Sequence, residues 1–349
     1  MGLLVRNLYR KEHRTTKRLA CFLVAGVFFS LVTLLFVVMC QLPCANDQAP
    51  YDYERWKRSR NLLAPSKDSR YTLVILIVSS PGNINERNAI RETWLIGIDE
   101  SLVMFRFVVG TAALNNVQSS QLAQEESVYM DMLLLNNVID SYEELTNKIM
   151  QAFIWVDKHV NYQYVLKIDD DSFVVVPGVL SELRFKPKER LYWGFFDGRA
   201  NVKTSGKWKE SKWNLCDRYL PHARGGGYVL SFDLIDFIAR NSDLLQMYLS
   251  EDVSVGTWLA PLKIHRHHDQ NFDTEYMSRG CLNSYLIIHK QSVSSLRELH
   301  NNIETAGVLC KTEVVLRGSY EYNWNYPPSE CCNRSLVQQR RPSKAASVT

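Results

Sequence analysis

Val165-Leu166-Lys167-Ile168-Asp169-Asp170-Asp171-Ser172-Phe173 is the part of the sequence that constrains the structure most. It begins as an apolar run typical of a buried strand and ends in three consecutive carboxylates, which repel one another unless a cation gathers them. Open α/β sheets bind their ligands at the carboxyl ends of the strands. Oxygen ligands at such an edge suit Mg²⁺ or Mn²⁺ holding a diphosphate. The triplet alone is equally consistent with an acidic turn that caps a strand and faces water.

Strands and helices alternate in the sequence that precedes this stretch. The predicted elements are, in order, a strand at 71–80, a helix that Asn85 caps, a strand at 103–110, a helix at 117–129, a strand at 132–135 and a helix that a capping box at 141–144 opens. A regular alternation of this kind favours βαβ units. We therefore expect a mixed, mainly parallel sheet of the nucleotide-binding type.

The turn after the first predicted strand carries two arginines. Residues 80–83 break the strand, and the helix that follows contains Arg87 and Arg91. Free backbone N–H groups and arginines converge where a strand, a glycine loop and a helix start meet, which suits an anion. Both arginines are therefore candidates for contact with a nucleotide, although a surface helix with solvated arginines has the same pattern.

The second half of the chain supplies further candidates. Gly225-Gly226-Gly227-Tyr228 predicts a turn with positive φ, or a backbone that approaches a ligand closely, which makes Gly226 and Gly227 candidate binding residues. Glu251 and Asp252 open a predicted helix, where carboxylates act either as caps or, at the edge of a cleft, as a general base. A histidine near a carboxylate-held metal can add a ligand. The candidates are His289 after the apolar run 285–288, and the cluster of His265, His267 and His268.

The amino terminus predicts a membrane anchor. Residues 19–42 contain no charged residue and are long enough to span a bilayer, which takes about 20 apolar residues. The basic flank at 1–18 should stay in the cytosol. Residues 43–69 read as a stem, residues 70–335 as the lumenal domain and residues 336–349 as a disordered tail. A formal net charge of +4 is too small to indicate nucleic acid as a partner.

The cysteines and one sequon agree with a lumenal location. Six of the eight cysteines lie beyond the predicted membrane segment, and disulfides are expected in an oxidising compartment. Adjacent cysteines do not bond easily, so Cys331 and Cys332 are each expected to have a distant partner. Asn333 begins a sequon for N-glycosylation.

Four motifs in fixed order resemble the β-1,3-glycosyltransferase family, which includes galactosyl- and N-acetylglucosaminyltransferases and the fringe proteins. They are 87–94, the triplet 169–171, 225–228 and 251–256, and the resemblance covers about residues 72–332. The resemblance implies a single GT-A domain that binds a nucleotide-diphosphosugar. It also implies that Asp171 binds Mn²⁺, that Asp169 and Asp170 serve the nucleotide sugar, and that Asp252 is the catalytic base. Glu251 is the fallback base.

The resemblance also implies a second metal ligand and bears on the disulfides. His289 aligns with the family's late metal-binding histidine, and His268 is the competing candidate. Several family members carry a cysteine where this chain has Arg224, so their usual disulfide is not expected. Our hypothesis is that Cys216 bonds Cys281 and that Cys310 bonds Cys331 or Cys332.

Further segments are most similar to those family members that build the linkage region of proteoglycans. The segments are 191–196, 216–221, 250–256, 272–281 and 289–292. This similarity implies an inverting transfer of galactose from UDP-galactose to O3 of galactose in Gal-β1,4-Xyl on a core-protein serine, at the Golgi membrane. The alternatives are another β-1,3-galactosyl- or N-acetylglucosaminyltransferase, and a non-catalytic Golgi chaperone on the same fold.

Overall fold

The computed structural model describes residues 71–334. The predicted cytosolic tail, membrane anchor, stem and carboxyl-terminal tail lie outside the described residues. Within 71–334, no helix combines the length and apolar character needed to cross a membrane. The proposed domain boundaries and anchor therefore stay predictions.

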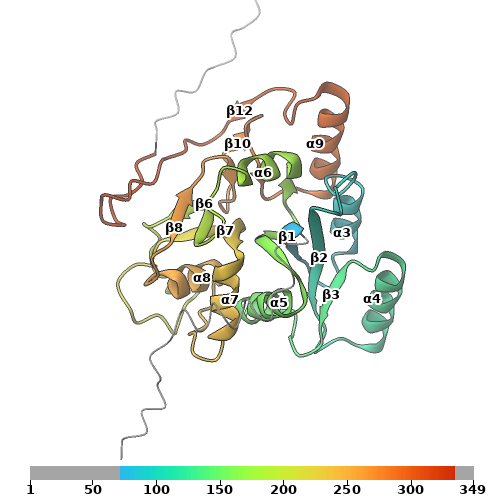
Figure 1. The fold of residues 1–349 in the computed structure, drawn as a ribbon, viewed down its shortest axis with the longest axis horizontal. Helices are drawn as coiled ribbons and strands as arrows, with labels where there is room; N and C mark the ends of the chain where they lie inside the picture. Colours follow the sequence, from blue (N-terminus) through green and yellow to red (C-terminus); the bar gives the residue numbers. More distant parts are fainter. Residues whose placement is uncertain (1–70, 335–349) are drawn as a thin grey trace, which may run out of the picture. The chain divides into compact units, whose positions relative to one another are not determined.

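A sheet of seven strands runs through the domain in the order β3-β2-β1-β4-β7-β6-β8 (Figure 1). The strands are β1 (Tyr71–Val78), β2 (Val103–Gly110), β3 (Met132–Leu135), β4 (Tyr162–Asp169), β6 (Leu191–Asp197), β7 (His222–Ser231) and β8 (His265–His268). Neighbouring strands are parallel except where β7 pairs with β4 and β6. The prediction of a mixed, mainly parallel sheet is therefore confirmed.

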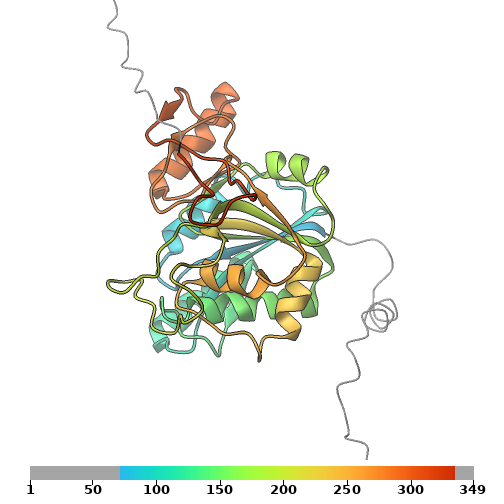
Figure 2. The ribbon, with the colours of Figure 1, turned by 90° about the vertical axis from the view of Figure 1, so that its left-hand side faces the viewer.

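Helices cover both faces of this sheet. They are α3 (Ile84–Arg91), α4 (Asn116–Tyr129), α5 (Leu145–His159), α6 (Val176–Leu183), α7 (Phe232–Arg240), α8 (Glu251–Leu259) and α9 (Val293–Ala306). Figure 2 shows α5, α7 and α8 below the sheet and α6 and α9 above it. The apolar side of α5 is fully buried at Ile149, Phe153 and Val156, as its helical spacing predicts.

The two central strands explain where the carboxylate triplet lies. Residues 73–77 of β1 have no exposed surface, so this strand is buried on both faces as its β-branched run predicts. β1 pairs with β4 in parallel, and Val78 is the register partner of Asp169. The triplet therefore begins at the carboxyl edge of the parallel strands.

A small second sheet brings a distant part of the chain to the same edge. It has the order β5-β11-β9, formed by β5 (Phe173–Val174), β11 (Ile287–Ile288) and β9 (Phe272–Asp273). Ile288 is the register partner of Phe173. This pairing places His289 beside the residues that follow the triplet.

Two helix starts differ from the predicted ones. Helix α3 begins at Ile84 with Asn83, and not Asn85, at the N-cap position. Helix α5 begins at Leu145, after the predicted capping box. The backbone N–H of Glu144 does donate to Ser141 Oγ at 3.3 Å, but this bond closes a turn that precedes the helix.

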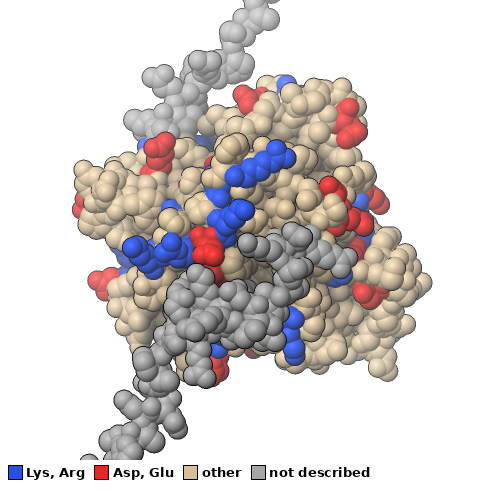
Figure 3. All heavy atoms as spheres, in the orientation of Figure 1, with Lys and Arg blue, Asp and Glu red and all other residues tan. Residues whose placement is uncertain are grey.

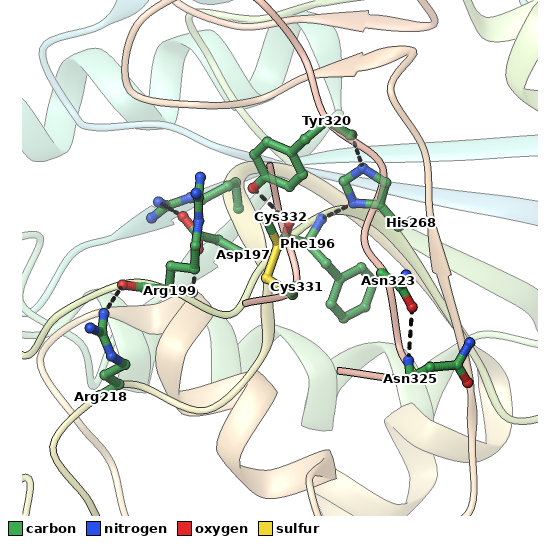
Figure 4. The surroundings of a disulfide bond; sticks show 11 residues. Phe196, Asp197, Arg199, Arg218, His268, Tyr320, Asn323, Asn325, Cys331 and Cys332 are labelled. Atoms are coloured by element: carbon green, nitrogen blue, oxygen red, sulfur yellow. Dashed lines mark hydrogen bonds and ion pairs between the residues drawn. A yellow bond between two sulfur atoms is a disulfide. The ribbon is translucent and has the colours of Figure 1, made fainter. Parts of the chain in front are cut away.

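The predicted disulfides were wrong. Cys281 bonds Cys310, because the loop before β12 (Val314–Val315) returns beside β10 (Gly280–Cys281) and holds the two Cα atoms 5.9 Å apart. Cys331 and Cys332 bond each other, against the expectation that adjacent cysteines do not. Figure 4 shows this bond beside Phe196 and Tyr320, with Tyr320 donating its hydroxyl to the carbonyl of Phe196. Cys216 is a free, exposed thiol.

Candidate active site

A cavity of about 620 Å³ lies at the carboxyl edge of the central strands. It collects side chains from the end of β4, from β7, from the start of α8 and from the residue after β11. The predicted site residues that line it are Asp169, Asp170, Asp171, Gly226, Glu251, Asp252 and His289. The fold thus gathers into one cavity residues that are up to 120 positions apart in the sequence.

Asp169, Asp171 and His289 form a cluster suited to a metal ion. One ligand atom from each lies within 4.8 Å of the others. His289 Nε2 is 3.0 Å from Asp171 Oδ1 and 3.4 Å from Asp169 Oδ2. His289 Nδ1 lies 3.2 Å from the carbonyl oxygen of Glu275, so donation of the Nδ1 proton leaves the lone pair of Nε2 facing the carboxylates.

The atoms of the cluster favour a shared proton or a cation. Nε2 of His289 and Oδ1 of Asp171 are buried without a hydrogen-bond partner among the described residues. Their close approach is favourable only if they share a proton or a metal ion. Burial lowers the pKa of His289, but the nearby carboxylates of Asp169 and Asp171 outweigh burial and raise the pKa to about 9. The donor set of two carboxylates and one imidazole fits a divalent metal, which would displace that proton.

Lys167 links this cluster to the opposite wall of the cavity. Its side chain is 1% exposed, and Nζ lies 2.8 Å from Asp169 Oδ1, 2.6 Å from the carbonyl oxygen of Gly225 and 3.2 Å from Glu251 Oε2. Burial of Asp169 raises its pKa, but the Lys167 ammonium and His289 outweigh burial and lower it. Sequence reasoning treated Lys167 only as part of a strand. The sequence did contain a sign of its role: Lys167 is a charged residue within an apolar run, and a buried lysine needs partners.

The two carboxylates at the start of α8 have different surroundings. Asp252 is 18% exposed and lines the cavity, and its Oδ2 accepts from Gly225 N at 3.0 Å and lies 3.9 Å from His222 Nε2. Glu251 is 3% exposed, and Tyr228 donates its hydroxyl to Oε1 at 2.5 Å. Burial is the main cause that raises the pKa of Glu251 to about 7. Asp252 is thus the carboxylate better placed to meet a substrate.

The glycines of β7 provide space for these side chains. A Cβ on Gly226 would lie 2.5 Å from His289 Nδ1, and one on Gly225 would lie 3.3 Å from carboxylate oxygens of Asp252 and Glu251. None of the three glycines has a positive φ, because residues 222–231 form one continuous strand. The predicted turn was therefore wrong. The glycines approach side chains of the cavity wall, and their close approach to a ligand stays a prediction. Gly227 faces Ile287 and does not line the cavity.

Arg87 and Arg91 lie outside the cavity. Arg87 is fully buried, pairs with both oxygens of Glu125 at 2.7–2.8 Å and donates to the carbonyl of Ser80. Arg91 pairs with Asp131 at 2.8 Å and with Glu125. These arginines therefore stabilise the first loop and the elements beside it. They do not lie at the cavity, where the predicted contact with a nucleotide would be.

Asp170 and His268 have partners that limit their roles. Asp170 Oδ2 accepts from Asn83 Nδ2 at 2.9 Å, and burial is the main cause that raises the pKa of Asp170 to about 6. His268 Nδ1 accepts from Phe196 N at 3.0 Å while Nε2 lies 2.8 Å from the carbonyl oxygen of Tyr320 (Figure 4). Both ring nitrogens of His268 are thus occupied. Of the two candidate histidines, only His289 lies at the carboxylates.

Comparisons with known proteins agree with this geometry. Residues 85–270 match the family described as Galactosyltransferase. The chain is 42% identical to β-1,3-galactosyltransferase 6 of Mus musculus over 322 residues, which cover 89% of this chain and 94% of that protein. It is 31% identical to UDP-GalNAc:β-1,3-N-acetylgalactosaminyltransferase 2 of Xenopus tropicalis over 60% of this chain and 42% of that protein. It is 31% identical to hydroxyproline O-galactosyltransferase GALT6 of Arabidopsis thaliana over 67% of this chain and 35% of that protein. The chain therefore belongs to the galactosyltransferase family and is a galactosyltransferase.

Proposed function

We propose that this chain transfers galactose from UDP-galactose to O3 of the galactose in Gal-β1,4-Xyl-O-Ser of proteoglycan core proteins. The observation that carries the proposal is that one cavity holds both the Asp169, Asp171 and His289 cluster and the partly exposed carboxylate of Asp252. The first group suits a diphosphate and the second suits an attacking hydroxyl. The name of the mouse relative, which contains β-1,3-galactosyltransferase, supports the linkage and the sugar.

The proposed reaction is a single inverting displacement. The sugar is α-linked in UDP-galactose and β-linked in the product, so the acceptor oxygen attacks from the face opposite UDP. The bond between the anomeric carbon and the acceptor O3 forms while the bond to the diphosphate breaks, and its electron pair leaves with UDP. The proton of the acceptor hydroxyl passes to Asp252, which must lie within about 3 Å of that hydroxyl.

The contacts of Asp252 suit this role. The N–H of Gly225 holds Oδ2 at 3.0 Å, and the N–H of Val253 holds Oδ1 at 2.9 Å. These two donors orient the carboxylate toward the cavity, and 18% of the Asp252 side chain stays exposed. His222 is buried beside it, with Nδ1 2.9 Å from the carbonyl oxygen of Leu220. A fixed carboxylate loses little entropy in meeting the acceptor.

Asp169, Asp171 and His289 would hold the metal, for which we propose Mn²⁺. Bound there, the ion supplies positive charge that stabilises the leaving diphosphate. Glu275 keeps the imidazole of His289 in the orientation that presents Nε2 to the carboxylates. Lys167 supports Asp169 from the buried side, so that its other oxygen faces His289.

We also propose the GT-A fold and a Golgi location for this domain. The mainly parallel sheet with its site at the carboxyl edge supports GT-A. The uncharged stretch 19–42 behind a basic flank supports a single-pass anchor with residues 70–335 in the lumen. In sealed Golgi vesicles, protease should spare the catalytic domain until detergent is added. Cleavage of the domain in intact vesicles would indicate that the domain faces the cytosol, opposite to the proposed topology.

The test is a transfer assay on the detergent-solubilised full chain. UDP-galactose and a Gal-β1,4-Xyl glycoside are supplied with Mn²⁺ or with a chelator, and the product linkage is read by NMR. We expect a β1,3-linked product that requires metal, and a loss of at least about 100-fold in Asp171→Ala. Asp217→Ala, which removes an exposed carboxylate outside the cavity, is the matched control.

Other outcomes would redirect the proposal. UDP-N-acetylgalactosamine belongs in the same assay, because one relative is named for that sugar. A preference for another UDP-sugar would keep the chemistry and reject the proposed donor. A folded chain that transfers no sugar from any donor to any acceptor would favour the non-catalytic alternative.

A further inference from the structure

The loop between β6 and β7 is strongly basic. Residues 199–218 contain two carboxylates, Glu210 and Asp217, and six cations, which are Arg199, Lys203, Lys207, Lys209, Lys212 and Arg218. The loop is the yellow-green segment that projects to the left in Figures 1 and 2. Figure 3 shows Lys and Arg side chains gathered in a band across one face of the domain.

Lys203 and Lys207 are the two loop lysines that line the cavity. The other cations of the cavity wall are paired: Lys167 with Asp169, Arg224 with Asp197 and Lys290 with Asp171. No carboxylate among residues 71–334 lies within 4.0 Å of Lys203 or Lys207. Both side chains are exposed, so two ammonium groups at the cavity are available to a ligand.

Contacts place both lysines on the Asp252 side of the cavity. The backbone N–H of Lys203 donates to Tyr219 Oη at 3.1 Å, and the ring of Tyr219 packs against His222 beside Asp252. Lys207 Nζ lies 4.9 Å from the centre of the Tyr142 ring. The hydroxyl of Tyr142 is 3.5 Å from Ser250 Oγ, the residue before α8.

The loop is held in place by a buried carboxylate. Glu210 Oε2 accepts from Leu249 N at 2.7 Å and Oε1 accepts from Lys212 N at 2.6 Å. The ring of Trp213 also packs against Tyr248, with centres 4.9 Å apart. These contacts tie the loop to the segment that leads into α8. The lysines are therefore presented by an anchored wall of the cavity.

We propose that Lys203 and Lys207 bind acidic side chains of the acceptor polypeptide near the glycosylated serine. This inference rests on the proposed function. The diphosphate of the donor belongs with the Asp169, Asp171 and His289 cluster, so an anion on the Asp252 side comes from the acceptor. The unmodified galactosyl-xylose disaccharide is neutral, so we assign the charge that matches two ammonium groups to the polypeptide. The loop thus selects acidic core-protein sequences.

The experiment compares two acceptor peptides with the full chain. Both carry Gal-β1,4-Xyl on one serine, flanked by Glu in one peptide and by Gln in the other. We expect the wild-type kcat/KM to be about fivefold higher for the Glu peptide at low salt, and the preference to fall as salt rises. In the double variant Lys203→Gln/Lys207→Gln the ratio of the two kcat/KM values should fall to about one.

A matched variant on the same loop separates local from general charge effects. Lys209→Gln/Lys212→Gln makes the same change in net charge at exposed positions outside the cavity, and should keep the preference for the Glu peptide. Thermal melting of both variants checks that each is folded. If the control variant loses the preference equally, the effect comes from overall charge and the assignment to Lys203 and Lys207 is rejected.

The remaining outcomes are distinguishable. A wild-type chain that uses both peptides equally overturns this inference and leaves the proposed function intact. A double variant that keeps the peptide preference but shows a higher KM for UDP-galactose assigns the lysines to the donor and also overturns it. A chain that transfers galactose to neither peptide contradicts the proposed function itself.

Discussion

At the scale of single residues, Asp252 carries the proton transfer in the proposed reaction. In Asp252→Asn the amide cannot take a proton, so we expect kcat to fall by about 10²- to 10⁴-fold. The amide has a single oxygen, so only one of the donors Gly225 N and Val253 N keeps its acceptor. Because the side chain is partly exposed, water can accept from the other donor, and the change should leave the domain folded. Steady-state kinetics and calorimetric binding of UDP with Mn²⁺ should show lost turnover with unchanged affinity.

Glu251 provides the contrast for that experiment. It is adjacent in sequence but buried against Tyr228 and Lys167, so Glu251→Gln should reduce turnover less than Asp252→Asn. If Glu251→Gln abolishes turnover and Asp252→Asn does not, the two roles must be exchanged. If UDP affinity collapses in Asp252→Asn, this residue is structural.

Single residues also show what the sequence could and could not predict. The candidate metal ligands Asp169 and Asp171 could be picked out from the sequence. Neighbouring carboxylates that follow a buried strand need either a cation or open solvent. The residue pattern alone left His289 as one candidate among several histidines, and the family resemblance was needed to favour it, since a histidine that ends a short apolar run is common. His222 was not predicted, because its contact with Asp252 depends on how β7 and α8 meet.

At the scale of elements, strand β7 forms one wall of the site and depends on its glycines. In Gly226→Ala the new methyl group would lie 2.5 Å from Nδ1 and 2.6 Å from Cγ of His289. His289 is 5% exposed and cannot move freely, so the imidazole must leave its contact with the carbonyl of Glu275. We expect Mn²⁺ affinity to fall by about 10- to 100-fold. A titration of activity against Mn²⁺ would measure this.

Gly82→Ala is the control for that substitution. Gly82 lies in the turn before α3, and a Cβ there would meet nothing within 4 Å. This variant should keep the wild-type dependence on Mn²⁺. If Gly226→Ala also keeps it, either the ring adjusts without cost or His289 does not hold the metal.

The glycines and the capping box show why element boundaries were harder to predict than elements. The three glycines indicated positive φ, yet their backbone is extended and what they provide is space for side chains from α8 and β11. The Ser141 pattern indicated a helix start, but the backbone there forms a turn and α5 begins at Leu145. Local sequence patterns indicate which backbone conformations a segment can adopt, whereas tertiary contacts decide which of these conformations it adopts.

At the scale of the whole molecule, the fold was predictable where the spacing of apolar residues in the sequence is regular. The first half, with buried parallel strands and an amphipathic α5, matched the expected alternation. The second half contains two-residue strands whose pairing depends on loops, as β5, β11 and β9 illustrate. The disulfide between Cys281 and Cys310 was missed for the same reason, because these residues meet only through the β10 and β12 ladder.

The buried acid Glu251 makes the stability of the whole domain depend on pH. Burial is the largest cause that raises its pKa from 4.5 to about 7, so the folded state prefers the neutral form. This preference favours the folded state fully below about pH 4.5 and is lost as pH rises through 7, because only the unfolded state ionises without cost. The loss amounts to at most about 3 to 4 kcal/mol of unfolding free energy, because a pKa difference of one between the two states corresponds to about 1.4 kcal/mol. Denaturant unfolding of wild type and Glu251→Gln between about pH 4.5 and 8 should show wild type losing stability relative to the variant as pH rises. Parallel pH profiles would mean that Glu251 stays ionised in the folded domain, held by the ammonium of Lys167 3.2 Å away.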